Sequence, residues 1–240
     1  MTTASAIILQ ARMASSRLPG KALANLGGRP LVARCVERLS VRSSMPVILA
    51  TTMRADDDVL AEEGRSLGIP VFRGAVDDVL GRFVQVVTTL GLLDCVRATA
   101  DNPAVDPDAP RRVLDLRRRA GADHVVEHGL PHGAAVEAIS ASALVRAATM
   151  TSDLGDREHV TPFIRRDRRF FALAAIAPAD VRRPDVRLTV DTAEDLERMR
   201  LLYALVGSPT PPPSLAAMIA AFDRAEAASR GPRTPEVTAR

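Results

Sequence analysis

Short apolar segments alternate along this chain with longer amphipathic segments. The short runs are rich in β-branched residues and predict strands at residues 6–9, 47–50, 70–72, 95–98, 124–127, 171–176 and 186–190. Apolar positions that recur at helical spacing predict helices at residues 31–39, 56–67, 77–90, 108–119, 140–150, 159–165 and 193–205. Strands that alternate with helices in this way predict an α/β fold with a mostly parallel central sheet and helices on both faces.

The alternation breaks at residues 207–213, which read Gly-Ser-Pro-Thr-Pro-Pro-Pro. Proline cannot continue a helix, so this segment is predicted to be a stiff connector. It separates an α/β domain of residues 1–206 from a C-terminal part of residues 214–240. Within that part, residues 214–228 are predicted to form a last helix, and residues 229–240 a frayed tail.

Composition narrows the class of protein. The chain of 240 residues is 47% hydrophobic and 25% charged, which is typical of a globular domain, and its net charge of +3 is too small to indicate a nucleic-acid partner. The longest uncharged apolar run, residues 170–179, is about half the length of a membrane helix, and the N-terminus lacks a signal-peptide pattern. We therefore expect a cytoplasmic protein with no membrane partner. Cys35 and Cys95 have no paired spacing and are expected in the core.

The loop after the first predicted strand carries the most distinctive chemistry. It reads Gln-Ala-Arg-Met-Ala-Ser-Ser-Arg-Leu-Pro-Gly-Lys over residues 10–21, and Lys21 is the single lysine among 32 basic residues. A compact ammonium suits a phosphate oxygen, and ligands of open α/β sheets bind beyond the carboxyl ends of the strands. The loop therefore indicates a triphosphate site, although neither GxxxxGK[ST] nor GxGxxG occurs. The alternative is a solvated basic loop in which Lys21 survives by chance.

Two aspartates follow predicted strands in the same way. Asp101 ends the segment RATAD after the fourth strand, and Asp191 ends RLTVD after the last strand. A carboxylate placed directly after a buried strand is held rigidly at the crevice, as a ligand of Mg²⁺ should be. Each has an ordinary alternative, because Asp-Asn-Pro at residues 101–103 is a turn signal and Asp191 or Thr192 is a candidate helix cap.

Three histidines imitate a metal site. His124, His128 and His132 lie four residues apart and would share one face of a helix. Their segment instead predicts a strand that runs into a Gly/Pro loop, so zinc is not expected there.

Six segments, taken in order along the chain, carry a family resemblance. They read LQARMASSRLPGKAL, LATT, FRGAVDDVLGRF, RATADNPAVDP, DREHVTPFI and RLTVDTAEDLERMR. Together they resemble the spore-coat-polysaccharide-type cytidylyltransferase family, which is related to CMP-3-deoxy-manno-octulosonate synthetase and acylneuraminate cytidylyltransferase. The resemblance covers residues 7–205 and implies a nucleotide-diphospho-sugar transferase (GT-A, Rossmann-like) fold, CTP as substrate, Mg²⁺ and a homodimer. It also implies a small β-arm near residues 130–140, and this arm or the C-terminal helix is expected at the dimer interface.

The resemblance also implies roles for individual residues. Arg12 and Lys21 would act as catalytic residues by contacting the triphosphate, and Asp101 and Asp191 would hold the metal. The wider nucleotide site would comprise Ala11, Arg12, Ser15, Ser16, Arg17, Lys21, Ala50, Thr51, Arg73 and Thr99. The acceptor site would comprise His132, Glu137, Arg157 and His159, with Glu158 in the same matching stretch.

The chain departs from the family pattern in two places. TADNP at residues 99–103 stands where the family typically has TGDCP, a change that keeps the metal aspartate. PHGAAVE at residues 131–137 stands where the family typically has PDGxDVE, so His132 and Ala135 replace two acidic residues. Loss of carboxylates from the acceptor region indicates an acceptor with fewer hydroxyl groups or more negative charge, or a site that is no longer catalytic.

These observations predict a Mg²⁺-dependent cytidylyltransferase. It would transfer CMP from CTP to a small acidic acceptor, such as a sugar acid or a phosphonate, and release pyrophosphate. One alternative is a glycosyltransferase of the same fold that uses a nucleotide sugar, but such an enzyme needs no triphosphate loop. The other is a nucleotide-binding partner protein without turnover, which would have little reason to keep Arg12, Lys21, Asp101 and Asp191 together.

Overall fold

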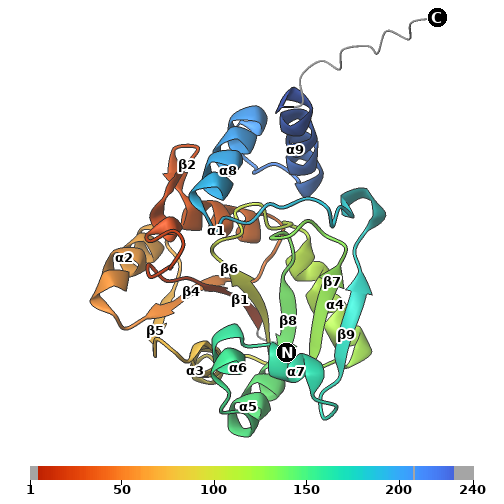
Figure 1. Ribbon diagram of the computed structural model, residues 1–240. Coiled ribbons are helices and arrows are strands. Elements are labelled where there is room, and N and C mark those ends of the chain that lie inside the picture. Colours follow the sequence, from red (N-terminus) through yellow and green to blue (C-terminus); the bar gives the residue numbers. More distant parts are fainter. Residues whose placement is uncertain (1–4, 208, 230–240) are drawn as a thin grey trace, which may run out of the picture.

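The computed structural model describes residues 5–207 and 209–229, and a seven-stranded sheet runs through its centre (Figure 1). The strands are β1 (Ser5–Gln10), β4 (Val47–Thr52), β5 (Val71–Gly74), β6 (Asp94–Thr99), β7 (His124–His128), β8 (Glu137–Ser140) and β9 (Ala172–Ile176). They lie in the order β5-β4-β1-β6-β8-β7-β9. β8 runs antiparallel to both of its neighbours, and the remaining neighbours are parallel. The predicted α/β fold with a mostly parallel sheet is confirmed.

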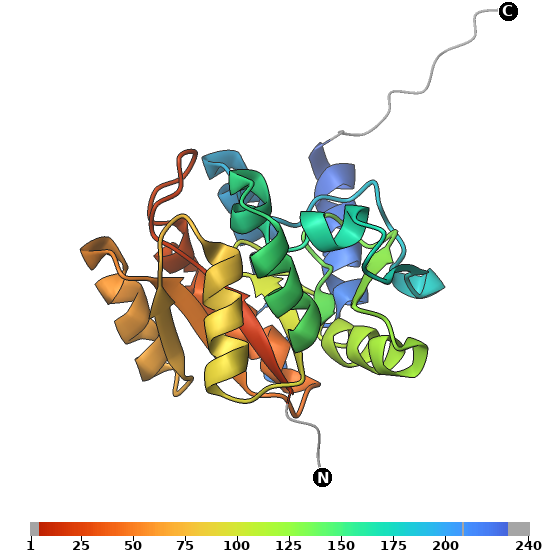
Figure 2. The same ribbon diagram turned by 90° about the horizontal axis from the view of Figure 1, so that it is seen from below.

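Helices cover both faces of this sheet because its central strands are apolar on both sides. In β1, Ile7 and Leu9 belong to one core cluster and Ala6 and Ile8 to the other. The first cluster is covered by α1 (Leu31–Val41), α2 (Asp58–Ser66), α4 (Ala109–Ala120), α8 (Ala193–Val206) and α9 (Leu215–Ser229). The second is covered by α3 (Val79–Thr89), α5 (Ala141–Met150) and α7 (Pro162–Arg166), and Figure 2 shows α3 and α5 along the same face. The two cysteines are free and buried, one in each cluster.

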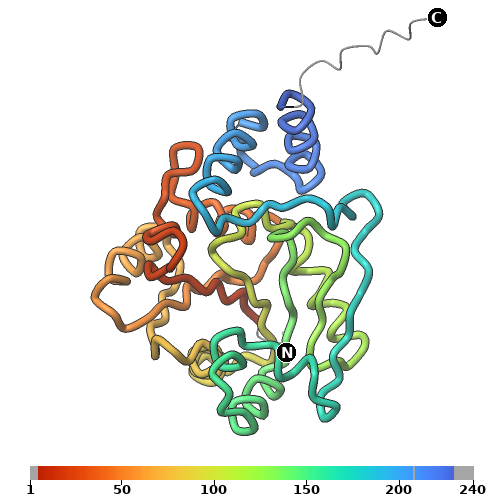
Figure 3. Tube along the Cα trace, in the orientation of Figure 1, coloured from red at the N-terminus to blue at the C-terminus, as the bar shows by residue number. Residues whose placement is uncertain are grey.

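The C-terminal helix shares the first core cluster. α9 lies beside α8 (Figure 3), and its Leu215, Met218 and Ile219 pack into that cluster. The end of the Pro-rich connector is anchored by buried Arg38, whose Nη1 donates to the carbonyl of Pro213 at 2.6 Å. The last helix therefore packs on the α/β domain. The predicted frayed tail lies outside the described residues from residue 230 onward.

The strand predicted at residues 186–190 is not a strand in the structure. This described segment makes one isolated bridge, between Arg187 and His132. Val186, Leu188 and Val190 are buried in the first core cluster. The alternating pattern therefore reflects burial of one side of an extended segment rather than pairing in the sheet.

Two further segments differ from the prediction. Instead of a separate β-arm near residues 130–140, Glu137–Ser140 forms β8 within the sheet, and the small two-stranded sheet consists of β2 (Asn25–Leu26) and β3 (Arg29–Pro30). The helix predicted at residues 159–165 begins at Pro162 as α7 and is preceded by α6 (Leu154–His159), whose residues are too polar to show an apolar periodicity. Across residues 5–207 and 209–229, the helices are too short or too polar to cross a bilayer.

Candidate active site

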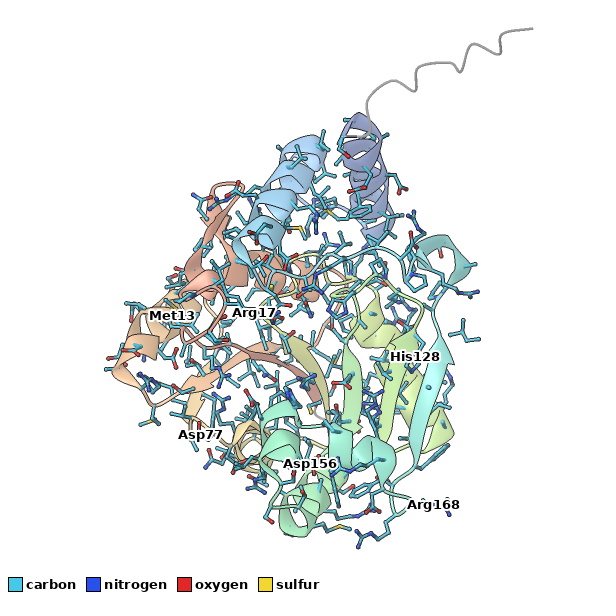
Figure 4. The ribbon with its side chains drawn as sticks, viewed as in Figure 1. Met13, Arg17, Asp77, His128, Asp156 and Arg168 are labelled. Atoms are coloured by element: carbon cyan, nitrogen blue, oxygen red, sulfur yellow. The ribbon has the colours of Figure 1, made fainter. Side chains whose placement is uncertain are left out.

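The loop of residues 11–20 leaves the carboxyl end of β1 and leads to the short 3-10 helix η1 (Lys21–Leu23). The backbone N–H of Met13 donates to Asp57 Oδ1 at 2.6 Å, and the N–H of Gly20 donates to the carbonyl of Met13 at 3.0 Å. Gly20 has a φ of +74°, which L side chains rarely adopt, so glycine allows the turn that directs Lys21. Figure 4 shows Met13 and Arg17 on this loop.

Lys21 joins segments that are far apart in the sequence. Its ammonium donates to the carbonyl of Val190 at 2.8 Å, and it lies 3.2 Å from Asp101 Oδ2 and 3.1 Å from Asp191 Oδ1. The side chain is only 14% exposed, so these contacts are largely shielded from water. The structure therefore brings together the lone lysine and the two aspartates that the sequence singled out.

Asp191 is surrounded by cations. Its Oδ2 accepts a hydrogen bond from Arg187 Nη2 at 2.8 Å, and its Oδ1 lies 3.0 Å from Arg17 Nη2. Burial raises the pKa of this carboxyl, but the hydrogen bond and charge of Lys21, followed by those of the arginines, outweigh burial and hold the pKa below its ordinary value. Asp191 is therefore ionised at neutral pH, as binding of a cation requires.

A cavity of about 320 Å³ lies at this edge of the sheet. It is lined by Gln10, Ala11, Arg12, Ala14, Ser15, Ser16, Arg17, Lys21, Ala22, Val79, Arg82, Arg97, Thr99, Ala100, Asp101, Glu158, His159 and Asp191. The lining includes both predicted metal ligands and all but three of the predicted nucleotide-binding residues. A cavity of this size suits a small-molecule ligand.

Ala50, Thr51 and Arg73, which the resemblance places around the base, lie outside that lining. Ala50 and Thr51 are buried within β4 rather than beyond its end. Arg73 Nε donates to the carbonyl of Thr52 at 2.7 Å, and Arg73 Nη1 donates to Asp58 Oδ1 at 2.6 Å. The Arg73 guanidinium thus links β5 to the segment after β4. A base-binding role for these three residues stays a prediction.

The residues predicted to bind the acceptor lie in different places. Of these, His159 lines the cavity. His132 is exposed in the loop before β8. Arg157 Nη2 donates to Asp78 Oδ2 at 2.6 Å, and Arg157 lines a separate surface depression together with Asp77. The structure therefore places the Arg157 guanidinium in a link between α6 and the start of α3 rather than at the cavity, because the Asp78 carboxylate holds it there.

Glu137, the remaining acceptor candidate, is buried in β8 beside Arg97. Its carboxylate accepts hydrogen bonds from Arg97 Nη1 at 2.6 Å and the Thr161 hydroxyl at 2.9 Å, and it lies 3.1 Å from His124 Nε2. Burial raises its pKa, but the charge of Arg97 and the hydrogen bonds of His124 and Thr161 outweigh burial and lower the pKa to about 2. Arg97 lines the cavity whereas Glu137 does not, so Glu137 acts on the cavity by holding Arg97.

Several polar groups of the lining were missed or only touched on by sequence analysis. Gln10, Arg82 and Arg97 were not assigned, and Glu158 was noted only within the matching stretch. Glu158 Oε1 pairs with Arg12 Nη2 at 2.8 Å. Arg97 could have been predicted. Alternate residues of a strand share a face, and Thr99, a predicted nucleotide-binding residue, follows Arg97 two positions later. Arg82 gave no local signal, since its place in the cavity depends on how α3 packs.

Asp101 and Asp191 form a donor set that fits Mg²⁺. In the described chain, no three His, Cys, Asp or Glu side chains gather in a group that would hold a metal by themselves. The two aspartates nevertheless converge on one ammonium, and Mg²⁺ is commonly held by one or two carboxylates with substrate phosphates as further ligands.

The first two of the three spaced histidines lie on a strand, β7, as predicted. His124 is buried there and His128 is exposed (Figure 4).

Comparisons with known proteins match most of the chain. A family model described as cytidylyltransferase matches residues 6–208. The spore coat polysaccharide biosynthesis protein SpsF of Bacillus subtilis is 35% identical over 210 residues, which cover 83% of this chain and 86% of that protein. The 3-deoxy-manno-octulosonate cytidylyltransferase of Haemophilus influenzae is 34% identical over 114 residues, which cover 45% of this chain and 43% of that protein.

Solved structures show the same fold. A cytidylyltransferase from Leptospira borgpetersenii superposes with a TM-score of 0.85 at 24% identity, covering 96% of this chain and 98% of that one. A CMP:2-keto-3-deoxy-manno-octonic acid synthetase complexed with CTP superposes with a TM-score of 0.66 at 16% identity, covering 84% of this chain and 99% of that one. The nucleotide-diphospho-sugar transferase type of fold predicted from the resemblance is confirmed.

Proposed function

This chain belongs to the cytidylyltransferase family, and we propose that it transfers CMP from CTP to a small acidic acceptor and releases pyrophosphate. The observation that carries this proposal is the meeting of Lys21, Asp101 and Asp191 in one cavity, with each carboxylate within 3.2 Å of the ammonium. A cation for phosphate oxygens next to two carboxylates for a metal is the combination that a metal-bound nucleoside triphosphate requires.

The donor half of the reaction relies on the loop after β1. Its serines and arginines line the cavity, and loop N–H groups, hydroxyls and guanidinium groups bind phosphate oxygens well. In this proposal Arg12 and Lys21 contact the triphosphate and offset the charge that builds on pyrophosphate as it leaves. Lys21 would then exchange part of its contact with the aspartates for a phosphate oxygen.

Asp101 and Asp191 are the residues that would hold Mg²⁺. When bound, the ion supplies charge that polarises the α-phosphate. The fixed orientation of Asp191, held by Arg187 and Lys21, keeps one carboxylate in place before any ligand arrives. Such preorganisation lowers the cost of reorganising the site during the reaction.

The acceptor is proposed to be a sugar acid, a phosphonate or a related small acid. The Haemophilus influenzae relative is named for a sugar acid, and Arg97 and His159 in the lining are groups that bind acidic oxygens. An acceptor oxygen would attack the α-phosphorus as the bond to pyrophosphate breaks, so that holding the two substrates in line supplies much of the rate. A homodimer is part of the proposal and is supported by the family resemblance alone, and the cytoplasmic location expected from the sequence is proposed with it.

Pyrophosphate release tests the proposal. Purified protein with Mg²⁺ is given CTP, UTP, GTP or ATP together with a panel of sugar acids and phosphonates. We expect release that needs both CTP and an acid, with a loss of 10²-fold or more in Lys21→Met. Arg111→Met is the control, because it removes the same charge from an exposed site on α4. Binding of CTP without release on any acid would instead support a partner protein, and turnover of a nucleotide sugar would support a glycosyltransferase.

A further inference from the structure

Arg82 stands out among the residues of the cavity. It lies on α3, and its side chain reaches the cavity although the residue is only 2% exposed. Gly74 at the end of β5 leaves room for it, since a Cβ at that position would lie 2.6 Å from Arg82 Cγ. The aliphatic part of the Arg82 side chain therefore packs against Gly74 at the end of β5, and this contact directs the side chain toward the cavity.

The other arginines and the lysine of the cavity lining all have acidic partners. The pairs are Arg12 with Glu158, Arg17 with Asp191, Lys21 with Asp101 and Asp191, and Arg97 with Glu137. Arg82 differs, because its Nε and Nη1 are buried and find no hydrogen-bond partner anywhere in residues 5–207 or 209–229. Among the arginines and the lysine that line the cavity, Arg82 is thus the one whose charge has no ion-pair partner within the described residues.

Burial, followed by the charge of Arg12, lowers the pKa of Arg82, while the charges of Asp57 and Asp78 act in the opposite direction. A guanidinium nevertheless stays protonated at neutral pH. A buried charge without a partner destabilises the folded protein unless something compensates it. Residues kept in such an unfavourable state are characteristic of binding sites.

We propose that Arg82 binds an oxyanion group of a substrate in this cavity. The planar fork of a guanidinium matches two oxygens of a phosphate or carboxylate, and Nε and Nη1 of Arg82 both carry N–H groups that have no acceptor within the described chain. The anion is either a phosphate of the nucleotide or the acid group of the acceptor, and this assignment of its source rests on the proposed function. The anion site itself rests on the burial and the missing partners of Arg82.

The first test uses Arg82→Met, which keeps an unbranched apolar side chain on α3 and removes the charged guanidinium. Thermal unfolding is followed without ligand and with sulfate at low millimolar concentration and constant ionic strength. Arg111→Met is the matched control, because its side chain is 79% exposed and lies on α4. We expect Arg82→Met to unfold about 2 °C or more above the wild type without ligand, and to lose at least half of the sulfate-induced shift that the wild type and Arg111→Met show. A sulfate shift that is unchanged in Arg82→Met, or a lower midpoint without ligand, would overturn the proposal.

The second test identifies the source of the anion. Calorimetric titration measures the binding of CTP and of cytidine, with Mg²⁺ present, to the wild type and to Arg82→Met. About tenfold or weaker CTP binding with unchanged cytidine binding assigns the anion to the nucleotide. Unchanged CTP binding, together with a lost sulfate shift, assigns it to the acid group of the acceptor. Equal weakening of CTP and cytidine binding would show that Arg82 contacts the nucleoside and would overturn the proposal. The sulfate experiment needs no nucleotide. A protein that binds no CTP would therefore refute the proposed function, while the proposal of an anion site at Arg82 would still be tested by sulfate.

Discussion

Replacing Glu137 with glutamine removes a buried charge while keeping the shape of the side chain. Arg97, Thr161 and His124 surround this carboxylate, and they lower its pKa from an ordinary value of 4.5 to about 2. A carboxyl whose pKa is lower in the folded chain than in the unfolded chain stabilises the fold when it is ionised. The shift corresponds to about 3 kcal/mol at pH 7, and Glu137→Gln should lose most of that free energy of unfolding.

The pH dependence distinguishes this cause from a simple packing defect. The stabilisation by Glu137 is fully present above pH 4.5 and is lost as the pH falls from 4.5 toward 2. Urea unfolding should therefore give a difference between wild type and Glu137→Gln of about 3 kcal/mol at pH 7 and about 2 kcal/mol at pH 3.5. Glu62→Gln is the control, because that carboxylate is 73% exposed on α2 and its loss should change stability little at either pH. A difference that stays constant with pH, or a variant as stable as the wild type at pH 7, would refute the reasoning.

Four other substitutions give separate expectations. Asp101→Asn and Asp191→Asn should each lower turnover by 10²-fold or more in the pyrophosphate assay, and retention of more than about a tenth of wild-type turnover would remove that residue from the metal site. Arg157→Met should lower the unfolding midpoint by about 2–4 °C and leave KM for both substrates unchanged, whereas a raised acceptor KM would return this residue to the acceptor site. Gly133→Ala should destabilise the fold by about 2 kcal/mol or more, because its φ is +93° and a Cβ would lie 2.7 Å from the Thr189 nitrogen; an unchanged midpoint would contradict that expectation.

The parts of the fold that were predicted have local causes. β1 and β4 are continuous apolar runs, and the main helices carry apolar positions at helical spacing, so the α/β architecture follows from short windows of sequence. β8 has only four residues and begins with Glu137, a poor candidate for a strand. Its charged first residue is tolerated because Arg97 lies opposite it in register on β6. That compensation is visible only once the two strands are paired.

The residues of the site also fall into those that local sequence patterns predicted and those that depend on packing. Lys21, Asp101 and Asp191 were predicted because each follows an extended segment or its loop, and the structure places them within one cluster. The segment before Asp191 is not a strand, yet it delivers the residue to the same edge, since the Val190 N–H donates to the Asp101 carbonyl at 2.8 Å. Arg82 lies on the buried face of α3 and reaches the cavity from there. Its position depends on packing between α3 and the end of β5, which no local pattern encodes.

Thermal unfolding with Mg²⁺ and each of CTP, UTP, GTP and ATP tests the central claim most directly. Wild type, Lys21→Ala and the control Arg111→Ala are compared at about 100 times the expected dissociation constant. Cytidylyl transfer predicts a Mg²⁺-dependent rise in the midpoint of about 5–10 °C that is largest with CTP, is lost in Lys21→Ala and is kept in Arg111→Ala. No shift with any triphosphate, or an equal shift in Lys21→Ala, would contradict a CTP site built on Lys21 and the two aspartates.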